Sequence, residues 1–126
     1  MEYVKIVVRK DYSFVEKYSE GATIDILGNF LTDDVGCSVG IPIFREFIND
    51  PWEKLTSSNY SYIGTIGERV IIGCAMDWGT PDEEVFETTI DELNYVLDRW
   101  EELCKQKPKE IIITRDKGKI TVEGKN

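Results

Sequence analysis

Apolar residues recur at helical spacing between Ile90 and Cys104, and no other feature of the chain constrains the fold as strongly. Thr89 stands just before this pattern, where its hydroxyl can cap a free helical amide, and Glu92 completes a capping box. A stripe of this width must be buried, so we expect an amphipathic helix over residues 89–106. The stripe consists of Ile90, Leu93, Val96, Leu97, Trp100, Leu103 and Cys104.

Four segments in the first 76 residues have the pattern of strands. Residues 3–8 are rich in Val and Ile, and residues 22–27 alternate with a period of two. Residues 60–66 and 69–76 are apolar runs joined by a short turn with a glycine, which predicts an antiparallel hairpin. Because the second arm is almost wholly apolar, we expect it in the centre of a sheet and the first arm nearer an edge.

A second hairpin and a shorter helix are also predicted. Residues 110–114 and 119–122 flank an Asp-Lys-Gly turn, which is typical of a hairpin. Pro42 suits the first turn of a helix over residues 41–50, in which the apolar side chains share one face.

Two segments show no clear period. Residues 28–40 are rich in Asn, Asp, Ser and Gly and are expected to form a loop, whereas residues 11–20 fit either a short helix or a loop. A chain of 126 residues has the length of one domain, so we expect a single globular domain, 1–126. We predict an α+β fold, with an antiparallel sheet of about five or six strands and both helices packed on one face.

Cysteine usage and hydropathy favour a cytoplasmic protein. Cys37, Cys74 and Cys104 lie far apart, and one of them must stay unpaired. This pattern predicts a reducing compartment, with each cysteine as a small core residue. The first residues show no signal peptide, and no window approaches the roughly 18 apolar residues of a membrane span, so no membrane association is expected.

The chain contains no histidine, which removes the commonest general base and metal ligand. A Ser-His-Asp or Cys-His site is therefore excluded within one chain. The three scattered cysteines give no zinc pattern, and neither a Walker-type loop nor a GxGxxG follows a predicted strand. The sequence thus predicts no cofactor and no metal.

Adjacent carboxylates are the remaining chemistry for an enzyme. The adjacent acids Asp33-Asp34 and Asp82-Glu83-Glu84 could hydrolyse glycosides if burial drove their pKa values apart, but adjacent acids in polar loops are usually solvated. Asp77, Asp82 and Glu84 offer oxygen ligands to calcium, although their spacing lacks the EF-hand pattern. We therefore expect no catalysis, and a carboxylate-dependent hydrolase stays as an alternative.

The net charge of the chain lies entirely between Asp77 and Glu102, where ten acids and one base give −9. The other 100 residues carry 14 acids and 14 bases. A patch of one sign steers a basic partner and repels nucleic acid, so we expect a protein partner with a basic surface. The residues predicted to contact it are Asp77, Trp78, Asp82, Glu83, Glu84, Glu87, Asp91 and Asp98.

The two halves of this window differ in how far local structure explains them. In the helical half, Asp91 and Glu92 complement the helix dipole, and Glu101 and Arg99 have candidate partners in Lys105 and Glu102. In the loop half, residues 77–87, the five acids have no base among them. Self-repulsion there suggests a cationic partner surface.

The three tryptophans have different predicted roles. Trp100 lies on the buried stripe, and Trp52 is expected in the core. Trp78 lies in a loop among acids, as an interface anchor does, or else it folds back to cover the sheet.

The C-terminal third of the chain, from Ile90-Asp91-Glu92-Leu93 through Leu103 and Lys107-Pro108 to the closing hairpin, resembles small bacterial immunity proteins. These belong to contact-dependent growth inhibition and related polymorphic toxin systems. The resemblance implies a small, acidic, cytosolic protein that binds a cognate toxin domain, commonly a basic nuclease, and blocks it. It carries over no toxin-binding residue, because the family has no shared binding motif in this sequence.

The sequence therefore predicts a non-catalytic immunity protein that presents an acidic surface to a basic toxin. A homo-oligomeric structural or regulatory domain, in which an apolar sheet edge pairs between chains, is the other alternative. The oligomeric state does not follow from the sequence.

Overall fold

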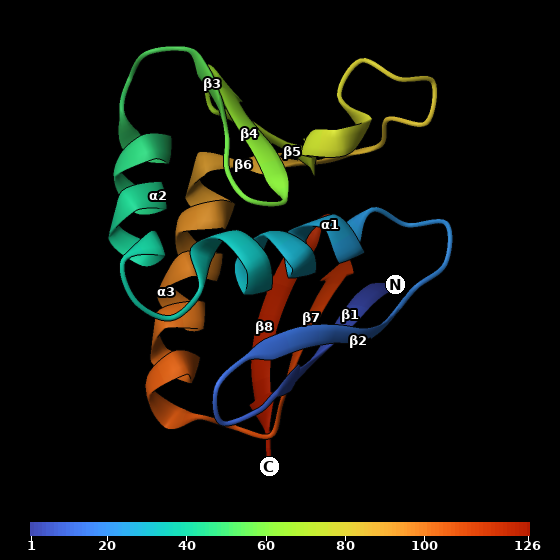
Figure 1. Cartoon of the computed structure of the whole chain (residues 1–126), viewed down its shortest axis with the longest axis vertical. Coiled ribbons are helices and arrows are strands. Elements are labelled where there is room, and N and C mark those ends of the chain that lie inside the picture. The colour runs from blue at the N-terminus through green and yellow to red at the C-terminus, as the bar shows by residue number, and fades with distance from the viewer.

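The computed structural model describes residues 1–126 and contains two antiparallel sheets of four strands each (Figure 1). The α+β class is confirmed, but the expected single sheet of five or six strands is divided into two sheets with eight strands. The first sheet, in the order β2-β1-β7-β8, contains β1 (Glu2–Val8), β2 (Ser13–Tyr18), β7 (Glu110–Asp116) and β8 (Lys119–Lys125). The second, in the order β3-β4-β5-β6, contains β3 (Lys54–Ser57), β4 (Ser61–Ile66), β5 (Arg69–Cys74) and β6 (Val85–Thr89).

The helices connect the two sheets. Helix α1 (Ile24–Asn29) contacts strands of both sheets and continues into a π-helical segment, Phe30–Val35. Helix α3 (Ile90–Gln106) packs on β8 of the first sheet and on β5 and β6 of the second. Helix α2 (Gly40–Asn49) packs on α3 and the π-helical segment (Figure 1). The expected packing of both helices on one sheet face is therefore wrong, because α3 contacts both sheets and α2 packs on α3 instead of on a sheet.

Helix α3 begins and ends where the sequence predicts. The Thr89 hydroxyl accepts a hydrogen bond from the Glu92 amide at 3.1 Å, and Lys107 closes the helix in the left-handed region. Glu92 does not reach back to Thr89. Its two carboxylate oxygens accept instead from the Thr88 hydroxyl at 2.8 Å and from the Ile120 amide at 3.2 Å. Glu92 thus joins β6, α3 and β8.

Residues 24–27 form the start of helix α1 and residues 22 and 23 precede it, so the prediction of a strand over residues 22–27 is wrong. A six-residue alternation is too short to distinguish the two periods, and the apolar spacing continues helically through the buried Leu27, Phe30 and Leu31. Gly28 lets this helix approach the first sheet, because a Cβ there would lie 2.8 Å from a Val4 methyl carbon. The predicted loop over 28–40 is likewise helical as far as Val35.

The predicted hairpins at 60–76 and 110–122 are confirmed as β4–β5 and β7–β8. Strand β5 is central, as expected, but β4 is central too, because the unpredicted β3 pairs with its other side. The prediction of a short helix or a loop over residues 11–20 is wrong, because strand β2 occupies Ser13–Tyr18. Strand β6 lies within the acidic window and was not predicted, although its buried Phe86 and Thr88 alternate with exposed residues.

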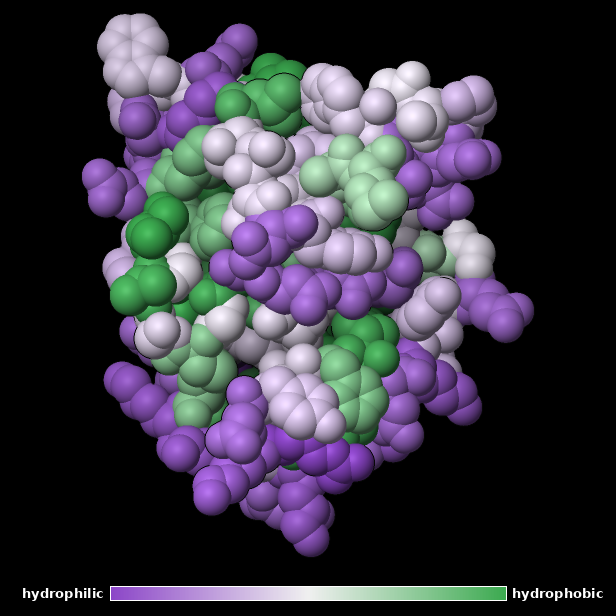
Figure 2. All heavy atoms as spheres, in the orientation of Figure 1, coloured by the Kyte–Doolittle hydropathy of each residue, from purple (hydrophilic) through white to green (hydrophobic).

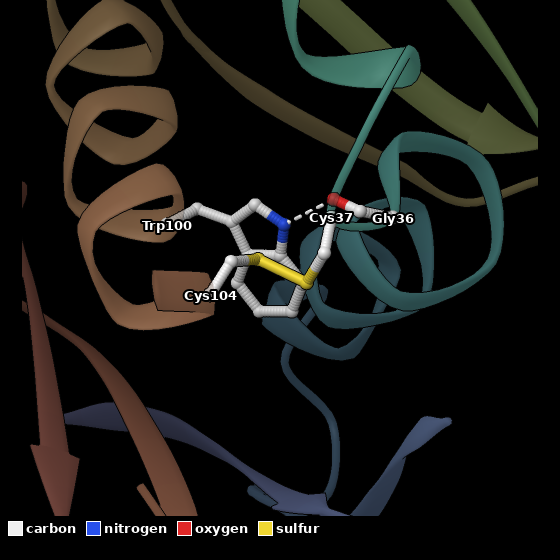
Figure 3. The surroundings of a disulfide bond; sticks show 4 residues. All are labelled: Gly36, Cys37, Trp100 and Cys104. Atoms are coloured by element: carbon white, nitrogen blue, oxygen red, sulfur yellow. Dashed lines mark hydrogen bonds between the residues drawn. A yellow bond between two sulfur atoms is a disulfide. The ribbon is translucent and has the colours of Figure 1, made fainter. Parts of the chain in front are cut away.

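The prediction that every cysteine is a core residue is wrong. Cys37, which is exposed, forms a disulfide with Cys104 across a Cα–Cα distance of 5.6 Å, and Cys74 is free and half-buried. The sequence separation of 67 residues gave no motif by which to recognise this pair. The Trp100 indole lies beside the disulfide and donates a hydrogen bond to the Gly36 carbonyl at 2.7 Å (Figure 3). The disulfide thus fixes α3 to the turn before α2.

The two sheets differ in how their edges are covered. At the outer edge of β8, the Ile120 and Val122 amides donate to the side chains of Glu92 and Tyr95, and Arg99 donates to the Val122 carbonyl. Strand β3 pairs only with β4, and no side chain forms a hydrogen bond with its outer backbone groups. The second sheet therefore has an open edge, and the first sheet is closed at β8.

Candidate functional site

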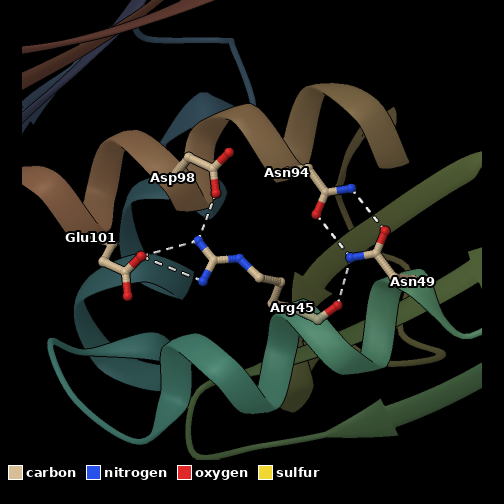
Figure 4. A network of polar contacts seen from close by, with 5 residues as sticks. All are labelled: Arg45, Asn49, Asn94, Asp98 and Glu101. Carbon is tan, nitrogen blue, oxygen red and sulfur yellow. Dashed lines mark hydrogen bonds and ion pairs between the residues drawn. The ribbon is translucent and has the colours of Figure 1, made fainter.

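Asp98, a predicted partner contact, belongs to a network between α2 and α3 (Figure 4). The Arg45 guanidinium lies 2.7 Å from the Asp98 carboxylate and 3.4 Å from that of Glu101. Asn49 and Asn94 exchange two hydrogen bonds of 2.9 Å beside it. Glu101 therefore pairs with Arg45 rather than with Lys105, and Asp98 has a structural role.

The other acids of β6 and α3 divide into paired and free side chains. Glu87 forms an ion pair with Arg69 on the neighbouring strand, so its expected isolation from bases is wrong. The predicted pair of Arg99 and Glu102 is confirmed at 3.1 Å. Asp91 is exposed in the first turn of α3 and has no ion pair, as suits a residue that complements the helix dipole.

The remaining predicted acids gather in one loop between β5 and β6. We call Asp77, Asp82, Glu83 and Glu84 the loop acids; Asp77 is half-buried and the other three are exposed. None of them forms an ion pair. The Glu83 carboxylate accepts a hydrogen bond from the Gly79 amide at 2.5 Å, which fixes its position in the loop. The loop acids are therefore a concentrated, uncompensated negative charge at one end of the molecule (Figure 1).

Trp78 folds back onto the second sheet and still remains 55% exposed. Its ring meets the Tyr62 ring edge to face, with centroids 4.7 Å apart. Trp100 is buried as predicted, whereas Trp52 is 75% exposed and the core prediction for it is wrong. Trp78 thus covers part of the sheet, which is one of its two expected roles, while about half of its surface stays exposed.

The sheet face beneath Trp78 carries exposed apolar side chains. We call Leu55, Ile66, Ile71, Trp78 and Val85 the apolar face; register places these strand residues on the side of the sheet opposite the buried Ile63, Ile72 and Phe86. A groove of about 520 Å³ runs over it, and its charged lining residues are Glu53, Glu83 and Lys54, whose ammonium group pairs with Asp50. This face was not predicted from the sequence. A signal was present, because consecutive residues of β5 are apolar, which indicates a strand that is covered on both faces.

Tyr62 supplies a polar atom in this groove. Its ring lies over Gly73, and a Cβ at this glycine would come within 2.3 Å of the Tyr62 ring. The Tyr62 hydroxyl is buried and has no hydrogen-bond partner. Burial, and next the adjacent Glu83 carboxylate, raise the pKa of Tyr62 to about 12. A ligand group that hydrogen-bonds to this hydroxyl would satisfy it.

The carboxylates considered for catalysis occupy different surroundings. Asp34 accepts hydrogen bonds from the Tyr60 and Ser61 amides at 2.8 and 2.9 Å, so it joins the π-helical segment to β4. Burial, and next the charge of Asp34, raise the pKa of Asp33. A two-carboxylate mechanism requires both groups to face one substrate. No group of three or more Cys, Asp and Glu side chains is arranged to hold a metal ion.

Comparison with known proteins adds no relative to this description. No family model, curated protein or solved structure matches the chain. None of its helices combines the length and the apolar character needed to cross a membrane.

Proposed function

We propose that this protein is a non-catalytic binding protein that docks a basic protein partner on the apolar face and its rim of loop acids. The observation that carries this proposal is the adjacency of exposed apolar side chains and acids without a base. Protein interfaces combine a desolvated apolar centre, often with a tryptophan, and a polar rim. Here Trp78 supplies the centre and the loop acids supply the rim.

The groove also suits one particular partner group, a cationic side chain. An arginine or lysine over the exposed Trp78 ring gains a cation–π contact, and the Glu83 carboxylate lies in the same groove. These features support a basic residue of the partner as the anchor of the complex.

More specifically, we propose that the partner is a toxin domain and that this protein is its immunity protein. The resemblance of the C-terminal third supports this choice. A nuclease carries a basic surface for the phosphate backbone of its substrate, and an acidic, apolar face complements and covers such a surface. Blocking the substrate groove would neutralise the toxin without any reaction.

The cytoplasmic location stays a prediction, and the Cys37–Cys104 disulfide weighs against it. Disulfides persist in oxidising compartments and are rare in the cytosol. Alkylation of free thiols in the native cell, followed by mass spectrometry, would show whether this pair is reduced where the protein acts.

The test is binding to the purified toxin domain encoded beside this gene. We expect a 1:1 complex whose association rate falls with salt, because steering by exposed charges is screened. The variant Asp77→Lys/Asp82→Lys/Glu84→Lys, which leaves Glu83 in place, should slow association by about 10-fold or more at low salt.

A matched control keeps the same change in net charge. Glu20→Lys/Asp116→Lys/Glu123→Lys reverses three exposed acids that form no ion pair and lie outside the groove. It should change the association rate much less than the loop variant does. Equal effects of the two variants, or no complex with the neighbouring toxin domain, would contradict the proposal.

A second candidate function is a homo-oligomer that pairs through the open edge of β3. The exposed Leu55 on this strand favours it. The net charge of −9 opposes self-association. Size-exclusion chromatography with light scattering distinguishes the two, since only the oligomer predicts a multiple of 14.5 kDa.

A further inference from the structure

A second cavity lies between the β1–β2 turn, the π-helical segment and the last turns of α3, at the end of the molecule away from the loop acids (Figure 1). Its volume of about 610 Å³ is in the range of small-molecule sites. Tyr12 and Phe14 form one wall, with their rings stacked at a centroid distance of 5.9 Å. Trp100 and the Cys37–Cys104 disulfide form another wall (Figure 3).

Three cationic side chains line this cavity: Arg9, Lys10 and Lys107. None of them forms an ion pair, although the chain holds 24 acids and 15 bases. The Arg9 guanidinium lies instead over the Phe14 ring, 6.0 Å from its centroid. Figure 2 shows hydrophilic side chains over this lower end of the molecule, around pale and green atoms that are less hydrophilic. Cations without carboxylate partners in so acidic a protein favour an anionic ligand.

The charge of the lining narrows the class of ligand. Asp11 and Asp33 also line the cavity, so three cations and two carboxylates give it a net charge of +1. This charge suits one carboxylate group and not a polyphosphate or a nucleic acid strand, which need many cations. The aromatic walls suit a planar, apolar body.

We propose that this cavity binds a small aromatic carboxylate. Its ring packs among Tyr12, Phe14 and Trp100, and its carboxylate is held by Arg9 and Lys107. This site goes beyond the proposed docking function, because the cavity shares no lining residue with the apolar face.

The test is a titration of the full chain, with its disulfide intact, with 1-naphthoate, followed by backbone amide chemical shifts. We expect saturable shifts at Gly36, Cys37 and Lys107, with no shifts at Leu55 and Ile66. Neutral 1-naphthamide should bind about 5-fold more weakly, because it loses the ionic contact. Acetate should bind more weakly still, because it lacks the apolar body.

Two variants distinguish this site from non-specific association. Arg9→Ala/Lys107→Ala should weaken 1-naphthoate binding by about 10-fold or more, because two charged contacts are lost. Lys105→Ala removes a nearby cation that does not line the cavity, and it should leave the affinity unchanged. Equal binding of 1-naphthoate and 1-naphthamide, shifts confined to the apolar face, or no saturation at millimolar concentration would each overturn the proposal.

Discussion

The acids of α3 and the loop acids carry the same charge, but only the first set is integrated into the fold. Asp98 and Glu101 contact Arg45, and Glu92 accepts hydrogen bonds from two other strands. The loop acids have no ion pair, and their loop is held by Trp78 on Tyr62 and by local turn contacts. Acids that look alike in the sequence therefore differ in the structure, because several acids of α3 stabilise the fold and the loop acids remain available to a partner.

The largest expected effect comes from removing the disulfide that anchors α3, whereas the loop between β5 and β6 has no covalent anchor. Cys37→Ser/Cys104→Ser releases a loop closed over 67 residues, and the free energy of unfolding should fall by about 4 kcal/mol. Urea unfolding followed by circular dichroism measures it. Cys74→Ser, which removes the free thiol, is the control, and an equal loss in both variants would be evidence against an anchoring role.

Glu92→Gln tests whether an acid within the window stabilises the fold. The amide can keep both contacts, with its oxygen accepting from the Ile120 amide and its NH2 group donating to the Thr88 hydroxyl, but both hydrogen bonds lose the negative charge of the carboxylate and become weaker. The free energy of unfolding should fall by about 2 kcal/mol. Asp91→Asn, one residue away and exposed, should cost less than half as much. Similar values for both would show that Glu92 acts only through its charge at the helix end.

Arg45→Met breaks the network between α2 and α3 while it keeps the aliphatic packing. Because the ion pairs are partly exposed, the loss should be about 0.5–1 kcal/mol. The same substitution in an Asp98→Asn/Glu101→Gln background should have almost no further effect. A full additional loss in that background would mean that Arg45 stabilises the fold by another contact.

Neutralising the loop acids should leave stability almost unchanged. Asp82→Asn/Glu84→Gln relieves repulsion and removes no ion pair, so the free energy of unfolding should change by at most about 0.5 kcal/mol, and upward. Thermal unfolding in low salt measures it. A clear destabilisation would show that these acids stabilise the fold, as the acids of α3 do.

The smallest expected effect is a pH dependence that connects the loop to α1. Burial, and next the charge of Glu84, raise the pKa of Asp25 above its ordinary value. The folded state then binds more protons than the unfolded state, so the contribution of Asp25 to stability falls as pH rises from the ordinary aspartate pKa of 3.8 through the folded pKa. Glu84→Gln should lower the pKa of Asp25 in a carboxyl NMR titration. An unchanged pKa would leave burial as the only cause.

An element could be predicted from the sequence where its own caps or turn residues define both of its ends. The capped helix α3 and the hairpins with short glycine turns were predicted with nearly correct ends, because caps and turns act within a few residues. The division into two sheets was not predictable in this way. It depends on α1, whose brief alternation imitates a strand until the later Phe30 and Leu31 are considered.

Only the negative charge of the candidate site could be predicted from the sequence. Asp82, Glu83 and Glu84 were recognised from the lack of neighbouring bases, but Glu87 and Asp98 were not distinguished from them. Their partners Arg69 and Arg45 are distant in sequence. The cationic cavity was missed for the same reason, since Arg9 and Lys107 come together only through the tertiary fold.

The side chains of α3 along the edge of β8 have a consequence for concentrated solutions of the protein. Because Glu92, Tyr95 and Arg99 occupy the backbone groups of Ile120 and Val122, another strand cannot extend the first sheet there. A substitution that detaches these side chains would leave the outer backbone N–H and C=O groups of β8 free to pair with a strand of another molecule. Helix α3 therefore also protects the edge of β8 against aggregation.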